Sequence, residues 1–514
     1  MKNVSQMKKI IIHSTILLLL VSCSKKNLEL TNPNSITSDT YWKTEADIQS
    51  ALGATYGLFK NVDGGLWGVR GVELSNGRGD DFFIRNDVSY LYQLSTFSNT
   101  PDNAAATNLW NVAYRAIFRA NQILENIDKI TSLSDQAKKA YIAEAKFLRG
   151  LNYFILVTNF GDVPLRNTLP KTTEDYFVAK SPEADVWKQI IQDFQDAQSG
   201  LPVSYDAKWT GRATKGAAIA YWGKAYLYTK DYAKAEATLL QLTQAPYTYA
   251  LMNNYGDNFI PTKENNQESV FEIQLSDVGG TNPWAGENAN ESLGVTTAQE
   301  FAPSEVAGWF EVSPTDKLFN EFQVEKTVSN DFDPRMYATL IWNYPGATFY
   351  TKPFSAFALQ FGYKSMYKKY QNYWQANELT GANGGSYTSS NNERALRYAD
   401  VLLMLAEAIT MQQRPAGAYT HVNAIRNRAQ LNALPAGYSS TQMMAEIRHQ
   451  RMLEFAREGV RFYDLKRWGL LQQEITNSDK EGRQSYNSTK HEYFPIPQSE
   501  LNANPKMIQS DPWK

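Results

Sequence analysis

Apolar residues recur at intervals of three and four along most of the chain, and this spacing predicts a mainly α-helical fold. One such stretch is residues 44–60, where Ile48, Leu52 and Tyr56 share a helix face. Residues 61–103 break the pattern, since they are rich in Gly, Asn and Asp and show no helical period. We expect loops and short strands there.

Two segments carry the residue pattern of a tetratricopeptide-like helical hairpin. In the first, Gly223, Tyr226, Ala235 and Leu239 are small, aromatic, small and bulky at the offsets of that repeat. Small residues at these offsets let two antiparallel helices approach closely. The same offsets recur at Ala406, Ile409, Ala418 and Val422. Helix pairs of looser spacing precede the two copies, so we expect about four stacked hairpins.

The stretch between the two copies, about residues 245–395, is different in character. It is rich in Gly, Asn, Ser, Tyr and Trp and has little period. Within it, residues 269–274 predict a strand, and Asp333-Pro334 predicts a helix start or turn. The sequence therefore predicts a tetratricopeptide-like helical-hairpin scaffold with a large irregular, loop-rich insertion and few short strands. Long irregular insertions of this kind often carry function.

The N-terminal segment, residues 1–22, predicts a lipoprotein signal peptide. Three lysines flank the start of an apolar core of about a dozen residues, which is too short to span a bilayer. The core ends in Leu20-Val21-Ser22-Cys23, which resembles the bacterial lipobox. Cys23 would then carry acyl chains such as palmitate and become the first mature residue. An uncleaved anchor with an incidental cysteine is the alternative.

Composition and charge exclude several functional classes. The chain is 43% hydrophobic and 20% charged, as in ordinary globular proteins, and its formal net charge of −2 argues against nucleic acid as a partner. A single cysteine cannot form an internal disulfide or a thiolate metal site. The sequence lacks a phosphate-binding loop, a dinucleotide fingerprint, a zinc-protease motif and a nucleophile elbow. We therefore expect no cofactor and no metal, and paired carboxylates are the remaining enzymatic option.

The acidic residues leave two weaker alternatives. A glycoside hydrolase needs two carboxyl groups about 5–10 Å apart, and among 53 acidic residues some pair meets that distance by chance. A secreted glycoside hydrolase of helical fold thus stays open as an alternative function. Asp80, Asp81 and Asp87 could hold calcium, but their spacing matches no known calcium loop, and a solvated acidic loop is the favoured interpretation.

Aromatic residues are in excess, with 12 Trp, 30 Tyr and 24 Phe. Flat rings in loops match the apolar C–H faces of sugars, and Tyr and Trp add polar edges for hydroxyl groups. The expected ligand-binding residues are Trp67, Trp284, Trp342, Tyr344, Tyr350 and Trp374, together with Asn76 and Asp81. Trp67 and Trp284 are the sharpest candidates, because glycines flank both. Core packing or loop stapling is an equally good interpretation of any single ring.

Several stretches, in order along the chain, resemble the RagB/SusD family of nutrient-binding lipoproteins from Bacteroidetes. Near the start, residues 38–47 read SDTYWKTEAD, and residues 143–150 and 160–165 read AEAKFLRG and FGDVPL. Residues 397–408 contain RYADVLLM and AEA, residues 458–469 read EGVRFYDLKRWG, and residues 494–497 read FPIP. The resemblance runs over nearly the whole mature chain.

This resemblance implies a function in nutrient uptake without catalysis. Members of the family cover a SusC-like TonB-dependent transporter in the outer membrane, capture oligosaccharides, polysaccharides or in some cases peptides, and deliver them to the channel. The resemblance thus implies a lipid-anchored protein of the cell outer membrane, facing outward. In the family, irregular loops on one face bind the ligand, and the helical repeats face the transporter.

The resemblance also divides the chain into parts of one compact mature unit. After the signal peptide, residues 23–240 would form an N-terminal helical part, residues 241–395 a loop-rich ligand-binding insertion and residues 396–514 a C-terminal helical part. The motif charges, which identify the fold rather than the ligand, are expected to form buried or half-buried ion pairs. They are Arg149, Glu407, Glu454, Glu458, Arg461 and Asp464. Gln450 stands where the family usually has glutamate, which would weaken one such pair.

Overall fold

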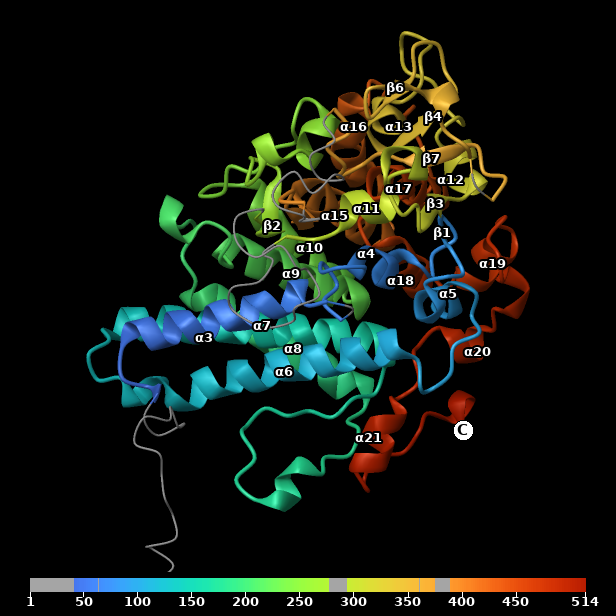
Figure 1. Cartoon of the computed structure of the whole chain (residues 1–514). Helices are drawn as coiled ribbons and strands as arrows, with labels where there is room; N and C mark the ends of the chain where they lie inside the picture. The colour runs from blue at the N-terminus through green and yellow to red at the C-terminus, as the bar shows by residue number, and fades with distance from the viewer. Residues whose placement is uncertain (1–40, 63, 277–293, 360, 375–388) are drawn as a thin grey trace, which may run out of the picture.

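Antiparallel helices packed side by side form the lower part of the protein in the view of Figure 1, in a computed structural model that describes residues 41–62, 64–276, 294–359, 361–374 and 389–514. The order of packing follows the chain, since each helix contacts the next one. The helices in the lower part are α3 (Glu45–Gly57), α6 (Ala104–Asn126), α7 (Asp135–Phe160) and α8 (Glu183–Gly200). Helices α9 (Lys215–Tyr228) and α10 (Tyr232–Leu239) continue the series above them, near the centre of the picture. This arrangement confirms the predicted helical-hairpin scaffold.

The α9–α10 hairpin shows why the small residues recur. A Cβ atom at Gly223 would lie 2.5 Å from Cγ of Leu239, so only glycine allows the two helices to approach this closely. Asp231 caps the second helix, with its side chain accepting a hydrogen bond from the backbone N–H of Lys234. The first predicted repeat copy is therefore a real helix pair.

The second copy continues the scaffold with α15 (Tyr398–Met411) and α16 (Tyr419–Arg428), followed by α17 (Ser440–Glu454). Its small residues, Ala406 and Ala418, lie in one buried cluster with Val422. Helix α10 packs directly against α15, so the N-terminal and C-terminal helices join across the insertion.

The upper part of the protein in Figure 1 contains short two-stranded sheets, which are formed mainly by the middle of the chain. The predicted strand is confirmed as β2 (Ser269–Ile273), which pairs antiparallel with β8 (Glu393–Arg397). In the same way, β4 (Leu340–Trp342) pairs with β7 (Ser365–Tyr367), and β5 (Thr348–Phe349) with β6 (Lys352–Pro353).

The prediction of only loops and strands for residues 61–103 is wrong in part. A strand is present, β1 (Phe82–Ile84), paired with β3 (Val312–Pro314), but so are two short helices, α4 (Gly71–Asn76) and α5 (Ser89–Ser95). Every residue of α4 is buried. Helix α4 has only six residues and buries its polar residues Glu73, Ser75 and Asn76 together with its apolar ones, so it leaves no amphipathic period in the sequence.

No helix in the described part of the chain is both long enough and apolar enough to cross a membrane. The predicted signal peptide, the lipidation site Cys23 and the candidate Trp284 lie outside the described residues.

Candidate functional site

A groove of about 660 Å³ lies in the insertion, and four aromatic side chains line it. We call it the aromatic groove. Its walls come from three segments, residues 254–262, 327–338 and 368–374, with Gln430 at one side. The aromatic members are Phe332, Tyr337, Tyr373 and Trp374. Hydrogen-bonding side chains such as Asn254 and Thr327 share the lining.

The first wall is set by the start of α13 (Pro334–Thr339), as Asp333-Pro334 predicts. The Asp333 carboxylate accepts the backbone N–H of Arg335 at 2.8 Å, and Pro334 occupies the first helical position. This cap fixes where the helix begins and therefore where Tyr337, one turn later, meets the groove.

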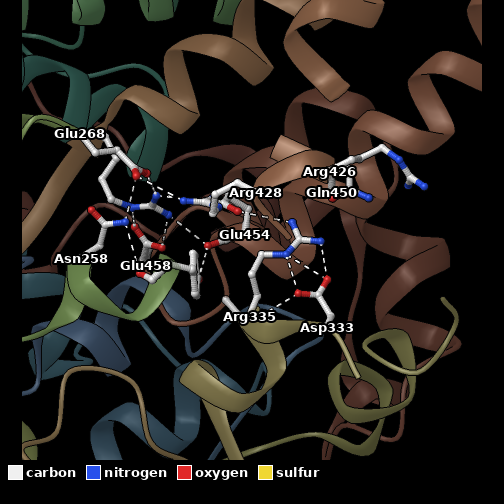
Figure 2. Close-up of polar contacts among 12 residues, drawn as sticks. Asn258, Glu268, Asp333, Arg335, Arg426, Arg428, Gln450, Glu454 and Glu458 are labelled. Carbon is white, nitrogen blue, oxygen red and sulfur yellow. Dashed lines mark hydrogen bonds and ion pairs between the residues drawn. The ribbon is translucent and has the colours of Figure 1, made fainter. Parts of the chain in front are cut away.

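A buried ion-pair network holds this wall against the C-terminal helices. Figure 2 shows Arg335 between Asp333 and Glu454, at 2.7 and 3.4 Å. Glu454 at the end of α17 also binds Arg397 and Arg428. Burial alone would raise the pKa of Glu454, but the charges of the three arginines hold it well below its ordinary value.

The same network fixes the other two walls. The Lys369 ammonium donates to the Glu458 carboxylate at 2.6 Å and to the Tyr255 hydroxyl at 2.8 Å. Asn258 donates to Glu268 at 3.0 Å, and Glu268 is paired with Arg397. Residues 254–262 and 368–374 are thereby attached to the core that holds α13.

The ring of Tyr337 is supported from behind. Trp342 lies 5.1 Å from it at an interplanar angle of 32°, and Tyr344 lies 5.3 Å away, edge to face. The Tyr337 hydroxyl donates to the Asp331 carboxylate at 3.0 Å. Partial burial, and then this contact, raise the pKa of Tyr337 to about 12, so the phenol stays protonated at neutral pH.

Trp374 offers the most exposed ring of the groove. Its exposed fraction is 44%, and its centroid lies 5.2 Å from that of Tyr373 at an angle of 79°. The two rings therefore present surfaces at right angles to each other. A ligand that lies on one ring meets the other at its edge.

The structure brings only part of the sequence-predicted set to this groove. Trp374 lines it, while Trp342 and Tyr344 stand behind Tyr337. Tyr350 is only 3% exposed, and its hydroxyl donates to Gln371. Trp342 and Tyr350 thus serve as packing, since rings in β4 and in the turn after β5 face the local core.

Three other predicted ligand residues lie elsewhere and are not available as a common platform. Trp67 is half-buried, with its ring 5.6 Å from Phe59. Asn76 is buried and accepts the backbone N–H of Gly459 at 2.9 Å, while Asp81 is fully buried. The reason is that α4 and β1 are internal elements rather than exposed loops. A ligand role for Asn76 or Asp81 is therefore not supported.

The prediction of a solvated acidic loop is wrong for Asp80 and Asp81, which are fully buried, whereas Asp87 is exposed. Cationic side chains bind Asp80 and Asp87. Arg461 and Lys317 bind Asp80 at 2.8 and 2.6 Å, and Arg85 binds Asp87. Across the described residues, no group of three or more His, Cys, Asp or Glu side chains is arranged to hold a metal ion.

The motif charges form the buried ion pairs that the sequence predicts. Arg149 binds Asp193 at 2.7 Å, Asp464 binds Arg451 at 2.7 Å, and Glu407 binds Arg467. Gln450 is buried and donates to Glu446 at 2.8 Å, while its side-chain carbonyl oxygen has no hydrogen-bond partner among the residues that the structure describes. Figure 2 shows Gln450 beside Arg426, apart from the Glu454 cluster.

Phe332, Tyr337 and Tyr373 line the groove, although the sequence pattern does not single them out. Two signals in the sequence point to them: the helix start at Asp333, which places Tyr337, and the position of Tyr373 next to Trp374.

A second hollow of about 420 Å³ lies between β2 and the loop before α9. Its charged members are already engaged, since Arg212 binds Glu144, and the buried Glu272 accepts the backbone N–H of Asn265. Two of its tyrosines, Tyr247 and Tyr249, stack on each other at 5.9 Å. The aromatic groove is the stronger candidate because it contains an exposed ring, that of Trp374.

Comparisons with known proteins agree with the fold. The profile of the SusD family matches residues 267–513, and a profile described as starch-binding associating with outer membrane matches residues 28–227. SusD-like protein P25 of Formosa agariphila is 27% identical over 517 residues, which cover 93% of each chain.

Solved structures extend the likeness to three dimensions. A crystal structure of a SusD superfamily protein from Bacteroides vulgatus is 36% identical, with a TM-score of 0.82, and the match covers 92% of this chain and 100% of that one. Surface glycan-binding protein A from Bacteroides thetaiotaomicron, in complex with laminarihexaose, is 22% identical with a TM-score of 0.74, covering 91% and 99%. That second likeness concerns the fold alone.

Proposed function

Because the chain belongs to the SusD family, we propose that it is a non-catalytic glycan-binding protein that holds an oligosaccharide in the aromatic groove. The observation that carries this proposal is the exposed Trp374 ring beside Tyr373, in a groove that Tyr337 and Phe332 also line. The profile described as starch-binding, which matches residues 28–227, supports the ligand class.

The physical basis is stacking combined with hydrogen bonding at the rim. Pyranose rings present apolar C–H faces that pack on aromatic surfaces, and the surrounding amides and hydroxyls meet the sugar hydroxyls. The ion-pair network beneath the groove keeps the rings in place before the ligand arrives, which lowers the entropy cost of binding.

We propose further that the protein works in glycan uptake at the outer membrane. In this arrangement the signal peptide, residues 1–22, is removed, and Cys23 carries acyl chains that anchor the mature protein to the outward face. A SusC-like TonB-dependent transporter receives the glycan. The lipobox-like sequence before Cys23 and the outer-membrane association in the profile that matches residues 28–227 support this arrangement.

The test is a glycan array followed by titration calorimetry on the purified protein. Trp374→Ala is expected to weaken glycan affinity about tenfold or more. Tyr176→Ala is the matched control, since Tyr176 is exposed but does not line the groove.

Unchanged affinity in the Trp374 variant would overturn the groove as the site. If the protein binds peptides and no glycan, its cargo is a peptide rather than a glycan. Sustained release of reducing sugar by the purified protein would overturn the non-catalytic function.

A further inference from the structure

The aromatic groove contains an ammonium group that has no counter-charge in the described part of the protein. Lys368 lines the groove and is only 8% exposed. Its Nζ lies 4.5 Å from the centroid of the Tyr373 ring. No described residue forms a hydrogen bond or an ion pair with this Nζ, although the adjacent Lys369 binds Glu458 at 2.6 Å.

The acidic side chains of the groove do not neutralise Lys368. The Asp331 carboxylate accepts the hydroxyl of Tyr337 and its neighbouring backbone N–H at 2.7 Å. Asp257 accepts the side-chain amide of Asn254 at 3.0 Å. Neither carboxylate forms an ion pair with Lys368. The groove therefore has one positive point among its rings, at Lys368, and negative charge at Asp331 and Asp257.

An isolated buried charge is costly unless a partner compensates it. In Lys368 burial lowers the pKa to about 8, and no neighbouring acid opposes this effect. At neutral pH most of the population is still charged. A ligand that brings an anionic group to this point gains a charge-assisted hydrogen bond in a site that excludes much of the water.

We propose that the groove selects glycans that carry an anionic substituent, a uronic acid carboxylate or a sulfate ester, and that Lys368 is the residue that recognises it. The inference rests on the proposed glycan-binding function and adds the substrate class. The stacked sugar ring would lie on Trp374 or Tyr373 while its anionic group meets Lys368. Both substituents present oxygen acceptors to an ammonium donor.

The experiment compares three probes by titration calorimetry on the full chain at pH 7. An alginate hexasaccharide supplies carboxylates, a carrageenan hexasaccharide supplies sulfate esters, and laminarihexaose is neutral. We expect the wild-type protein to prefer one or both acidic probes. Lys368→Gln should weaken the acidic probes about tenfold or more and change laminarihexaose affinity less than about twofold.

Lys364→Gln is the matched control, because Lys364 lies in the same stretch, is half-exposed and does not line the groove. It removes the same formal charge and should leave all three affinities unchanged. Lys368→Met serves as a second variant that keeps the side-chain length, and it should show the same selective loss.

The outcomes separate this inference from the proposed function. The inference is overturned if Lys368→Gln and Lys368→Met weaken the affinity for acidic and neutral probes equally. It is also overturned if neither affinity changes. Wild-type binding of laminarihexaose alone, abolished by Trp374→Ala, would also overturn it while leaving glycan binding in place. Loss confined to the carrageenan probe would assign sulfate, and loss confined to the alginate probe would assign uronate.

Discussion

Arg335 and Glu454 are 119 positions apart in the sequence, yet the guanidinium of one lies 3.4 Å from the carboxylate of the other with both side chains fully buried. This contact joins α13, which forms one wall of the aromatic groove, to the end of α17. The position of this groove wall therefore depends on a charge pair that is fully buried.

Removing Arg335 should cost considerable stability. Arg335→Met leaves Asp333 and Glu454 with less compensation in a buried site, and we expect the free energy of unfolding to fall by about 3 kcal/mol. Urea denaturation measures this change. Arg414→Met is the control, because its ion pair with Glu236 is at the surface, and it should cost less than about 1 kcal/mol. Equal losses in the two variants would contradict the importance of burial.

Asp81 should make the protein less stable as the pH rises through the weakly acidic range. Burial, and then the Asp80 charge, raise its pKa from 3.8 to about 6. Between these two pH values, the folded state keeps a proton on Asp81 that the unfolded state has already released. The resulting stability is present below pH 3.8 and is lost as the pH rises through 6.

Asp81→Asn mimics the protonated form and should remove this dependence. The difference in unfolding free energy between this variant and wild type should shift in favour of the variant by about 1–3 kcal/mol as the pH rises from 4 to 7. Thermal or urea unfolding across that range checks the result, with Asp87→Asn, an exposed site, as the control. A constant difference across the range would show that Asp81 does not titrate between the two states.

Tyr337 should contribute to binding through its ring rather than its hydroxyl. Tyr337→Ala removes the stacking surface and should weaken glycan binding by about 1–2 kcal/mol. Tyr337→Phe keeps the ring on Trp342 and loses only the contact with Asp331, so its affinity should stay within about threefold of wild type. Calorimetry with the tightest array ligand distinguishes them. A larger loss in the Phe variant would shift the role to the hydroxyl–Asp331 pair.

Gln450→Glu should destabilise this protein, although the resemblance described above leads one to expect a glutamate at this position. The Gln450 amide donates to Glu446, and Glu446 is already bound to Arg426 together with Glu325. A glutamate would place a buried carboxylate beside the half-buried Glu446, and we expect a loss of about 1–3 kcal/mol at pH 8. The loss should shrink at pH 5. Gain of stability at both values would mean that Arg426 accepts the new charge.

The scaffold could be predicted because its signals are local. Gly223 and Leu239 are sixteen positions apart, and their sizes report directly on how closely α9 and α10 pack. The Asp333-Pro334 helix start is equally local. By contrast, the sequence does not predict α4, because this short, fully buried helix shows no amphipathic period. The domain boundaries at residues 240 and 395 stay predictions.

The candidate site was only partly predictable, because the exposure of a ring depends on distant partners. Trp342 and Trp374 look equally suitable in the sequence. In the structure Trp342 lies in β4 against Tyr337, while Trp374 stays exposed. Lys368 and Lys369 are a similar case. Only the position of Glu458, far along the chain, decides which of the two ammonium groups is neutralised.

The ion-pair network also sets an order of events during biogenesis. The groove walls at residues 254–262 and 327–338 leave the ribosome well before Glu454 and Glu458, on which they depend. Until those last carboxylates arrive, Arg335 has only Asp333 and Arg397 only Glu268 as an acidic partner, and Lys369 lacks its ion pair with Glu458. The binding surface is thus completed only when nearly the whole polypeptide has been made, so a chain truncated before residue 454 should retain helical hairpins and bind no glycan.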